Sequence, residues 1–183
     1  MVGNFSTEGA DGDCRPERKS LVRVTRDMLD PDWDRFVARC PGGHHEQTSL
    51  WGQVKARYGW DPLRIIICKA GVTLGGVQLL IRQFGRLGRI GYVTRGPIVI
   101  SYDPELVVFL LNQLHSVASR ERLTYMVVVP PYNGHMFLPP LERLGFVEKP
   151  DFLPPSRVMT ATLLMDLSED LDILMAQMRQ LTR

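Results

Sequence analysis

Residues 63–100 read LRIIICKAGVTLGGVQLLIRQFGRLGRIGYVTRGPIVI, and this stretch decides the fold. It divides into three runs rich in aliphatic and β-branched residues, at 63–69, 72–83 and 90–100. The short Ala70-Gly71 connection and the glycine-rich connection after residue 83 are both typical of β-hairpins. The stretch therefore predicts three consecutive antiparallel strands.

A strand and two helices are predicted before these three strands. Residues 21–25 alternate between apolar and polar side chains, as a short strand does. The sequence Asp-Pro-Asp at 30–32 combines an N-cap acid with a proline in the first turn, which predicts the start of a helix. A second helix is predicted to begin near Thr48 or Ser49, either of which can cap it, and to end at Gly59.

The second predicted helix carries an aromatic and apolar stripe of Trp51, Val54 and Tyr58. Their spacing places them on one helix face. Such a stripe more often belongs to a core than to a binding site, so the pattern predicts that it packs inside the domain. Lys55, one turn beyond Trp51, is by the same reasoning an ordinary solvated lysine.

Helices and strands alternate after residue 100. Asp103 and Pro104 supply an N-cap and a first-turn proline for a long helix with an apolar stripe. Residues 124–130 are almost entirely apolar, which predicts a central strand that is covered on both faces. A short helix at 139–146 and a strand at 159–167 follow.

The chain divides into three parts. Residues 1–20 are polar and predict a disordered tail. Residues 21–167 predict one α/β (α+β) domain, built on a mixed, largely antiparallel sheet with helices on both faces. Residues 168–183 predict the start of a helix without a C-terminal cap, so we expect that helix to continue beyond this sequence.

Charge and hydropathy exclude several classes of protein. The 183 residues include 22 Lys and Arg against 20 Asp and Glu, which is too balanced for a strongly basic DNA-binding protein and leaves room only for a local RNA-binding patch. No stretch reaches the roughly 18 to 20 uninterrupted apolar residues of a membrane span. Residues 1–20 contain no apolar run for a secretion signal, which predicts a cytoplasmic protein.

The sequence assigns neither a metal site nor a catalytic nucleophile. Cys40 is followed closely by His44 and His45, but a second pair of ligands is missing, so this segment predicts a loop. His115 and His135 have no recognisable serine or cysteine partner. The catalytic residues therefore stay unknown at this stage.

The order of predicted elements resembles the GNAT acyltransferase fold. GNAT enzymes bind acetyl-CoA through a glycine-containing phosphate loop between the fourth strand and the next helix. Residues 99–104 stand at that place and contain no glycine, while Asp103 adds negative charge and Pro104 removes an N–H donor. We therefore expect no acetyl-CoA and no other cofactor.

Three segments narrow the resemblance: QTSLWGQVK at 47–55, YVTRGP at 92–97, and the strand 163–167 that leads into Ser168. In this order, and over about residues 33–183, they resemble the Fem (FemABX) family of peptidoglycan aminoacyltransferases. The resemblance implies transfer of an amino acid from aminoacyl-tRNA to the stem peptide of a cell-wall precursor. It also implies that this chain is the first, precursor-binding half, with residues 168–183 leading to a missing second half.

The resemblance also implies the binding residues. Lys55 matches the family lysine four residues after the helix tryptophan, and would contact the diphosphate of a UDP-linked precursor. Tyr92, Arg95 and Gly96 match a family segment that we place at the precursor groove. The break that Gly96 and Pro97 predict within an apolar run fits this role, because it can present an arginine fork to an anionic ligand.

Several alternatives stay open. The precursor could be UDP-linked or lipid-linked, and aminoacyl-tRNA would contact mainly the missing half. The attack of an amine on an ester needs a base, which the sequence does not identify. The competing hypothesis is a stand-alone GNAT-like N-acyltransferase, or an interaction module without catalytic activity.

Overall fold

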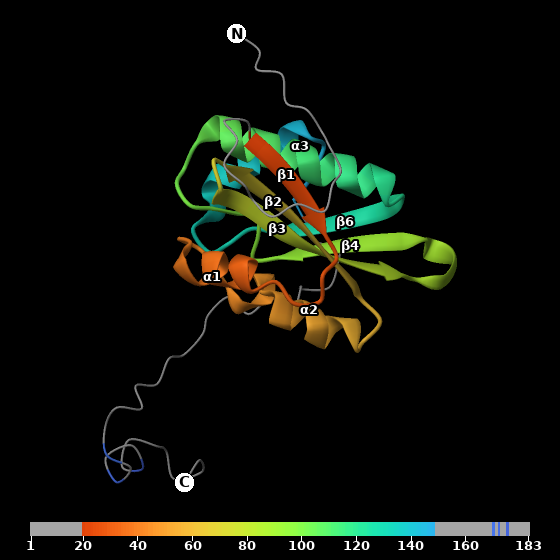
Figure 1. The fold of residues 1–183 in the computed structure, drawn as a ribbon. Helices are drawn as coiled ribbons and strands as arrows, with labels where there is room; N and C mark the ends of the chain where they lie inside the picture. The colour runs from red at the N-terminus through yellow and green to blue at the C-terminus, as the bar shows by residue number, and fades with distance from the viewer. Residues whose placement is uncertain (1–19, 149–169, 171, 173–174, 176–183) are drawn as a thin grey trace. The chain divides into compact units, whose positions relative to one another are not determined.

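The computed structural model describes residues 20–148, together with residues 170, 172 and 175. Six strands form one mixed sheet (Figure 1): β1 (Ser20–Thr25), β2 (Asp61–Lys69), β3 (Val72–Gln83), β4 (Arg89–Thr94), β5 (Ile98–Val99) and β6 (Leu123–Val129). The strand order is β1-β2-β3-β4-β6, and β5 pairs with β3. Within the described residues β4 and β6 are parallel, and the other pairings are antiparallel.

Four helices accompany this sheet in the described part of the chain: α1 (Pro31–Arg39), α2 (Ser49–Ala56), α3 (Pro104–Arg120) and α4 (Leu138–Arg143). Helices α1 and α2 lie on one face and α3 on the other, as predicted (Figure 1). Thr48, one of the two predicted caps, accepts a hydrogen bond from the Trp51 N–H at 3.2 Å. Among these residues, no helix is long and apolar enough to span a bilayer.

The core has one layer on each face of the sheet. Leu63, Ile65 and Ile67 of β2 pack with the buried side of α3, whereas Ile66 packs with Trp33 of α1. Successive side chains of a strand point to opposite faces, and both faces of β2 are covered, so its residues 62–68 are all buried.

The three predicted strands are confirmed, with an interruption in the third. The turn residues Ala70 and Gly71 both have positive φ, 50° and 78°, as a tight hairpin of this kind requires. The chain leaves β4 after Thr94 and continues as β5, which pairs with Gly75 and Gly76 of β3. Both β4 and β5 pair with β3, so the predicted break at residues 95–97 moves the chain from one end of β3 toward the other.

The prediction for residues 124–130 was wrong for the described part of the chain. Strand β6 ends the strand order there and is only partly buried. Met126 and Val128 pack against the core on the α3 side, but Tyr125 is 57% exposed. An apolar run shows only which side chains a strand carries. Whether they are buried depends on which other elements pack against the strand.

Three further predictions lie outside the described residues, apart from isolated positions. They are the disordered tail, the strand at 159–167 and the final helix at 168–183. The short helix at 139–146 is confirmed as α4, which begins one residue earlier and is followed by Gly145 at φ 84°.

We predict that Gly76→Ala destabilises the domain by about 1–3 kcal/mol, because there is no room for a methyl group at this position. A Cβ at residue 76 would lie 2.5 Å from the Ile65 carbonyl oxygen and 2.7 Å from the Trp33 ring. Urea unfolding measures the change. Val72→Ala at an exposed strand end is the control, with an expected change within about 0.5 kcal/mol. Equal stability of Gly76→Ala and the wild type would contradict the described packing of α1 on β3.

Candidate functional site

The side chain of Gln47 connects the loop before α2 to two strands. It is fully buried, its amide nitrogen donates to the Thr94 carbonyl, and its amide oxygen accepts from the Gln78 N–H at 2.7 Å. A Cβ at Gly96 would lie 2.7 Å from the Gln47 amide carbon, so only glycine fits beside it. Gln47 thus fixes the loop before α2 against the break between β4 and β5.

A second buried glutamine extends this polar network. The Gln78 amide nitrogen donates to the carbonyl oxygens of Thr48, at 2.9 Å, and Glu46, at 3.2 Å. Its amide oxygen accepts from the fully buried Arg64 at 3.1 Å. Arg64 also donates to the Asp27 carbonyl. Buried polar groups of this kind are stable only when they are paired, so the network specifies one position for residues 46–48.

The break in the sheet places Arg95 near two other polar side chains. Arg95 has a positive φ of 51°, and its charge reaches both His44 and Tyr92. Burial lowers the pKa of His44, and the positive charges of His45 and Arg95 lower it further, against the opposing effect of Glu46. Burial also raises the pKa of Tyr92, with a further rise from Glu46 that Arg95 opposes. These groups therefore share one electrostatic environment.

Lys55 adjoins the same loop through Trp51. The Lys55 Nζ lies 4.7 Å from the centroid of the Trp51 ring, a cation–π contact. The Trp51 ring meets His45 edge-on at 5.4 Å between centroids, and His45 lies 4.2 Å from His44 by the same measure. Lys55 is thus joined by continuous ring contacts to the surroundings of Arg95.

A second connection runs through Trp60. The Trp60 N–H donates to the Lys55 carbonyl at 3.2 Å, and the Trp60 ring lies 6.3 Å from the Tyr92 ring between centroids. The structure therefore gathers Lys55, Tyr92, Arg95 and their neighbours on the sheet face that α2 covers. Gly96 lies beside them, and its lack of a side chain leaves room for the Gln47 amide.

One polar atom near Lys55 has no partner. In the described part of the chain, the buried Trp51 Nε1 forms no hydrogen bond. An unpaired buried N–H is unusual and invites an explanation.

Some residues of this site were not predicted as functional. His44 and His45 were interpreted as a plain loop, and Gln47 and Glu46 were given no role. Gln78 carried a usable signal, because a glutamine within the apolar run of β3 has to be paired when it is buried. The sequence around Gln47 gives no such signal, because the hydrogen-bond partners of Gln47 are distant in sequence.

The start of α3 is occupied by its own cap. The Asp103 carboxylate accepts from the Glu105 N–H at 2.9 Å and from the Leu106 N–H at 3.4 Å. These are the groups that a phosphate would use at a helix N-terminus. The observed capping agrees with the sequence argument against a coenzyme A phosphate loop here.

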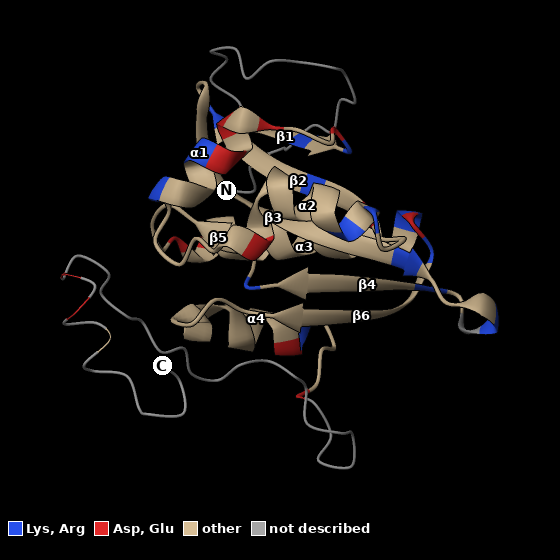
Figure 2. Ribbon diagram, turned by 90° about the horizontal axis from the view of Figure 1, so that it is seen from below, with Lys and Arg blue, Asp and Glu red and all other residues tan. Residues whose placement is uncertain are grey.

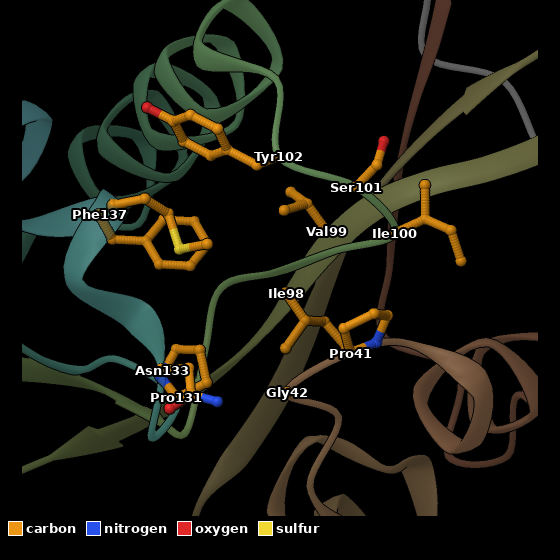
Figure 3. Close-up of a pocket in the computed structure, with 11 residues that line it drawn as sticks. Pro41, Gly42, Ile98, Val99, Ile100, Ser101, Tyr102, Pro131, Asn133 and Phe137 are labelled. Atoms are coloured by element: carbon orange, nitrogen blue, oxygen red, sulfur yellow. The ribbon is translucent and has the colours of Figure 1, made fainter.

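A mostly apolar pocket of about 190 Å³ lies next to this helix start (Figure 3). Ile98 and Val99 of β5, Pro131 and Phe137 contribute to its wall. Within the described residues, no group of three His, Cys, Asp or Glu side chains is arranged to hold a metal ion.

We predict that Gln47→Leu destabilises the domain by about 2–5 kcal/mol, because it leaves the Gln78 N–H and the Thr94 carbonyl buried and unpaired. The free energy of unfolding in urea is the measurement. Gln83→Leu serves as the matched control, because this glutamine is exposed at the end of β3 and its loss should cost about 0.5 kcal/mol or less. Wild-type stability of Gln47→Leu would show that this amide does not hold the loop.

Known proteins share this fold and part of this sequence. The Lipid II:glycine glycyltransferase of Staphylococcus aureus (strain COL) is 29% identical over 127 residues, which are 67% of this chain and 30% of that protein. The protein of the same name from strain USA300 is 28% identical over 127 residues. The chain thus spans about 30% of the length of these relatives.

Solved structures are also similar to this chain. The crystal structure of FemX superposes with a TM-score of 0.56 at 26% identity, covering 67% of this chain and 31% of that chain. Two acetyltransferases share the fold alone: a probable acetyltransferase, with a TM-score of 0.53 at 13% identity, and AAC(6')-Iy, with 0.50 at 12%. They cover 79% and 73% of this chain, and 97% and 95% of their own chains.

A profile of the FemAB family matches residues 28–139, more than half of the chain. These residues include the loop of Gln47, helix α2 and the break at Arg95. The GNAT-like fold and the family match agree with the resemblance found in the sequence, and this chain belongs to the FemAB family.

Proposed function

We propose that this chain is the precursor-binding part of an aminoacyltransferase of peptidoglycan synthesis. The complete enzyme would transfer an amino acid from aminoacyl-tRNA to the stem peptide of a cell-wall precursor. Membership of the FemAB family supports this, as does the name of the S. aureus relatives, which describes transfer of glycine to lipid II. Residues 21–167 would form the first GNAT-like half.

The observation that carries the proposal is the position of Lys55. Its ammonium lies on the Trp51 ring, in a helix that is joined through the loop of His44 and His45 to Arg95. A lysine is a compact point charge with three donors, suited to the oxygens of a diphosphate.

Tyr92 and Arg95 would hold the rest of the precursor. An arginine fork pairs with a carboxylate in a bidentate manner, and the stem peptide carries carboxylates. The Tyr92 phenol stays protonated at neutral pH, because burial raises its pKa, so it can donate a hydrogen bond. These residues would orient the acceptor amine for attack, which is itself a large contribution to the rate.

The chemical step joins the acceptor amine to the carbonyl carbon of the aminoacyl ester. The amine loses a proton, an amide bond forms, and the ester bond to the 3′-terminal ribose of the tRNA breaks, releasing the ribose hydroxyl. We assign neither the base nor the donors that stabilise the tetrahedral intermediate to residues of this chain. Its side chains bind and position the acceptor, without a cofactor.

The donor determines where the reaction would take place. Aminoacyl-tRNA is made and used in the cytoplasm, so we place the enzyme there, at the cytoplasmic stage of precursor assembly. The tRNA would contact mainly the remaining part of the full-length enzyme. Neither DNA nor a transmembrane segment has a part in this scheme.

The alternative is a stand-alone N-acyltransferase or an interaction module. The acetyltransferases of the same fold favour it, although they share only the fold with this chain. The capping of α3 by Asp103 argues against it, because the carboxylate would repel the pyrophosphate of coenzyme A.

We predict that a UDP-linked muramoyl pentapeptide raises the melting temperature of the chain, and that Lys55→Ala weakens its binding roughly tenfold or more. Loss of a charged hydrogen bond costs about 1.5–3 kcal/mol, and saturation at one hundred times Kd stabilises a protein by about 2.7 kcal/mol. Differential scanning fluorimetry measures the shift.

Lys69→Ala is the matched control, because this exposed lysine lies at the end of β2 in the hairpin that leads to β3. It should leave the shift unchanged. No shift of the wild type at millimolar ligand would refute precursor binding, and an equal loss in both variants would refute the role of Lys55. Heat released on titration with acetyl-CoA would instead favour the alternative.

A further inference from the structure

Helix α2 buries small residues and exposes bulky apolar ones, which is the reverse of the usual arrangement in a water-soluble domain. The residues that it buries are the small Ser49 and Gly52. Its bulky apolar side chains point outward, with 58% of Leu50, 45% of Val54 and 69% of the adjoining Tyr58 exposed. The prediction that Val54 and Tyr58 belong to the core was therefore wrong, although Trp51 is half-buried.

The reason for this arrangement is a close contact between α2 and the sheet. A Cβ at Gly52 would lie 3.0 Å from the Gln78 side-chain oxygen and 3.1 Å from Pro62. Only small residues fit on that side, so the larger ones are left outside. An amphipathic surface helix normally does the reverse, and a group of exposed apolar side chains marks an interaction surface.

Exposed cations adjoin this outer face. Between Thr48 and Tyr102 the sequence contains one acid, Asp61, which is paired with Arg26. The same stretch contains eight basic residues, of which Arg64 is fully buried and Arg89 is paired with Glu121. Figure 2 shows blue segments along α2 and at the hairpin that joins β3 to β4. Arg57 and Arg86 are exposed there. Exposed cations therefore adjoin the outer face of α2 although the net charge of the chain is near neutral.

We propose that the outer face of α2, formed by Leu50, Val54, Arg57 and Tyr58, docks on an anionic lipid bilayer. Apolar and aromatic side chains flanked by cations are the composition of helices that lie in a membrane interface. Each cation near an anionic membrane surface strengthens binding about fivefold. The protein would be a peripheral membrane protein.

This inference rests on the proposed function and adds the surface by which a lipid-linked acceptor, as described by the name of the S. aureus relatives, would be reached. Lys55 directly follows Val54 in α2, so the diphosphate would be bound beside the docking face. In a lipid-linked precursor the diphosphate joins the sugar to a chain that stays in the bilayer. A diphosphate site at the membrane surface therefore fits a lipid-linked acceptor, and a UDP-linked one would not require this face.

Other partners fit the same face less well. RNA phosphates would pair with Arg57 and Arg86, but the aliphatic side chains of Leu50 and Val54 offer no stacking surface for bases. A stable protein interface needs about 800 Å² on each partner, whereas this face belongs to a helix of 8 residues. The combination of exposed aliphatic groups with the exposed cation Arg57 favours the bilayer.

Co-sedimentation with vesicles tests the docking face, using the full 183-residue chain. We expect binding to vesicles that contain phosphatidylglycerol, little binding to pure phosphatidylcholine, and weakening by salt. Arg57→Gln should weaken binding about fivefold, and the double variant Leu50→Ser/Val54→Ser roughly tenfold or more. Val108→Ser and Arg120→Gln, at exposed positions of α3 on the opposite sheet face, are the matched controls and should bind as the wild type does.

Three results would overturn the docking proposal. They are no binding to anionic vesicles, equal binding by the double variant, and a dimer in size-exclusion chromatography that the double variant abolishes, since the last would make this face a protein interface. The thermal shift with the UDP-linked muramoyl pentapeptide, measured on the same variants, separates the two proposals. Loss of vesicle binding with an intact shift supports the docking face, and a missing wild-type shift with intact vesicle binding refutes the proposed function alone.

Discussion

The buried amide of Gln47 is the contact on which the arrangement of the site depends. It pairs with backbone groups of β3 and β4 in a region that excludes water, where an unpaired donor or acceptor is costly. Its own carbonyl accepts from the Trp33 indole at 2.6 Å, which adds α1 to the same junction. One side chain therefore determines how the loop before α2, the end of β4 and helix α1 meet.

Local sequence signals were sufficient for most of the fold. The paired positive φ angles at Ala70 and Gly71, and the caps Asp30, Thr48 and Asp103, involve residues that are close in sequence. Such features follow from side-chain chemistry and from the period of each element. The burial of β6 and of the outer face of α2 could not be predicted in this way. An apolar stripe looks the same whether or not another element covers it, and for α2 the cover depends on a contact between Gly52 and Gln78.

The features of the site likewise fall into two groups: those that the local sequence predicts and those that depend on tertiary structure. The break at Arg95 and Gly96 was predictable, because glycine and proline interrupt an apolar run. Its consequence, the approach of Arg95 to His44 and Tyr92, depends on the path of the chain after the break. That path is set by Gly75 and Gly76, some twenty residues earlier, which accept β5 as a neighbour because they have no side chains. Lys55, Tyr92 and Arg95 were found through the family resemblance, and their proximity follows from tertiary structure.

The capping of α3 by Asp103 has a consequence for the energetics of the domain. A helix start that is completed by a bound phosphate gains stability from that ligand, and its folding then depends on the ligand concentration. Here a side chain of the protein satisfies the same N–H groups. The ordered state of this end of α3 is therefore independent of the metabolic supply of any nucleotide. A ligand bound at the proposed site on the α2 face of the sheet would not compete for the contacts that keep α3 folded.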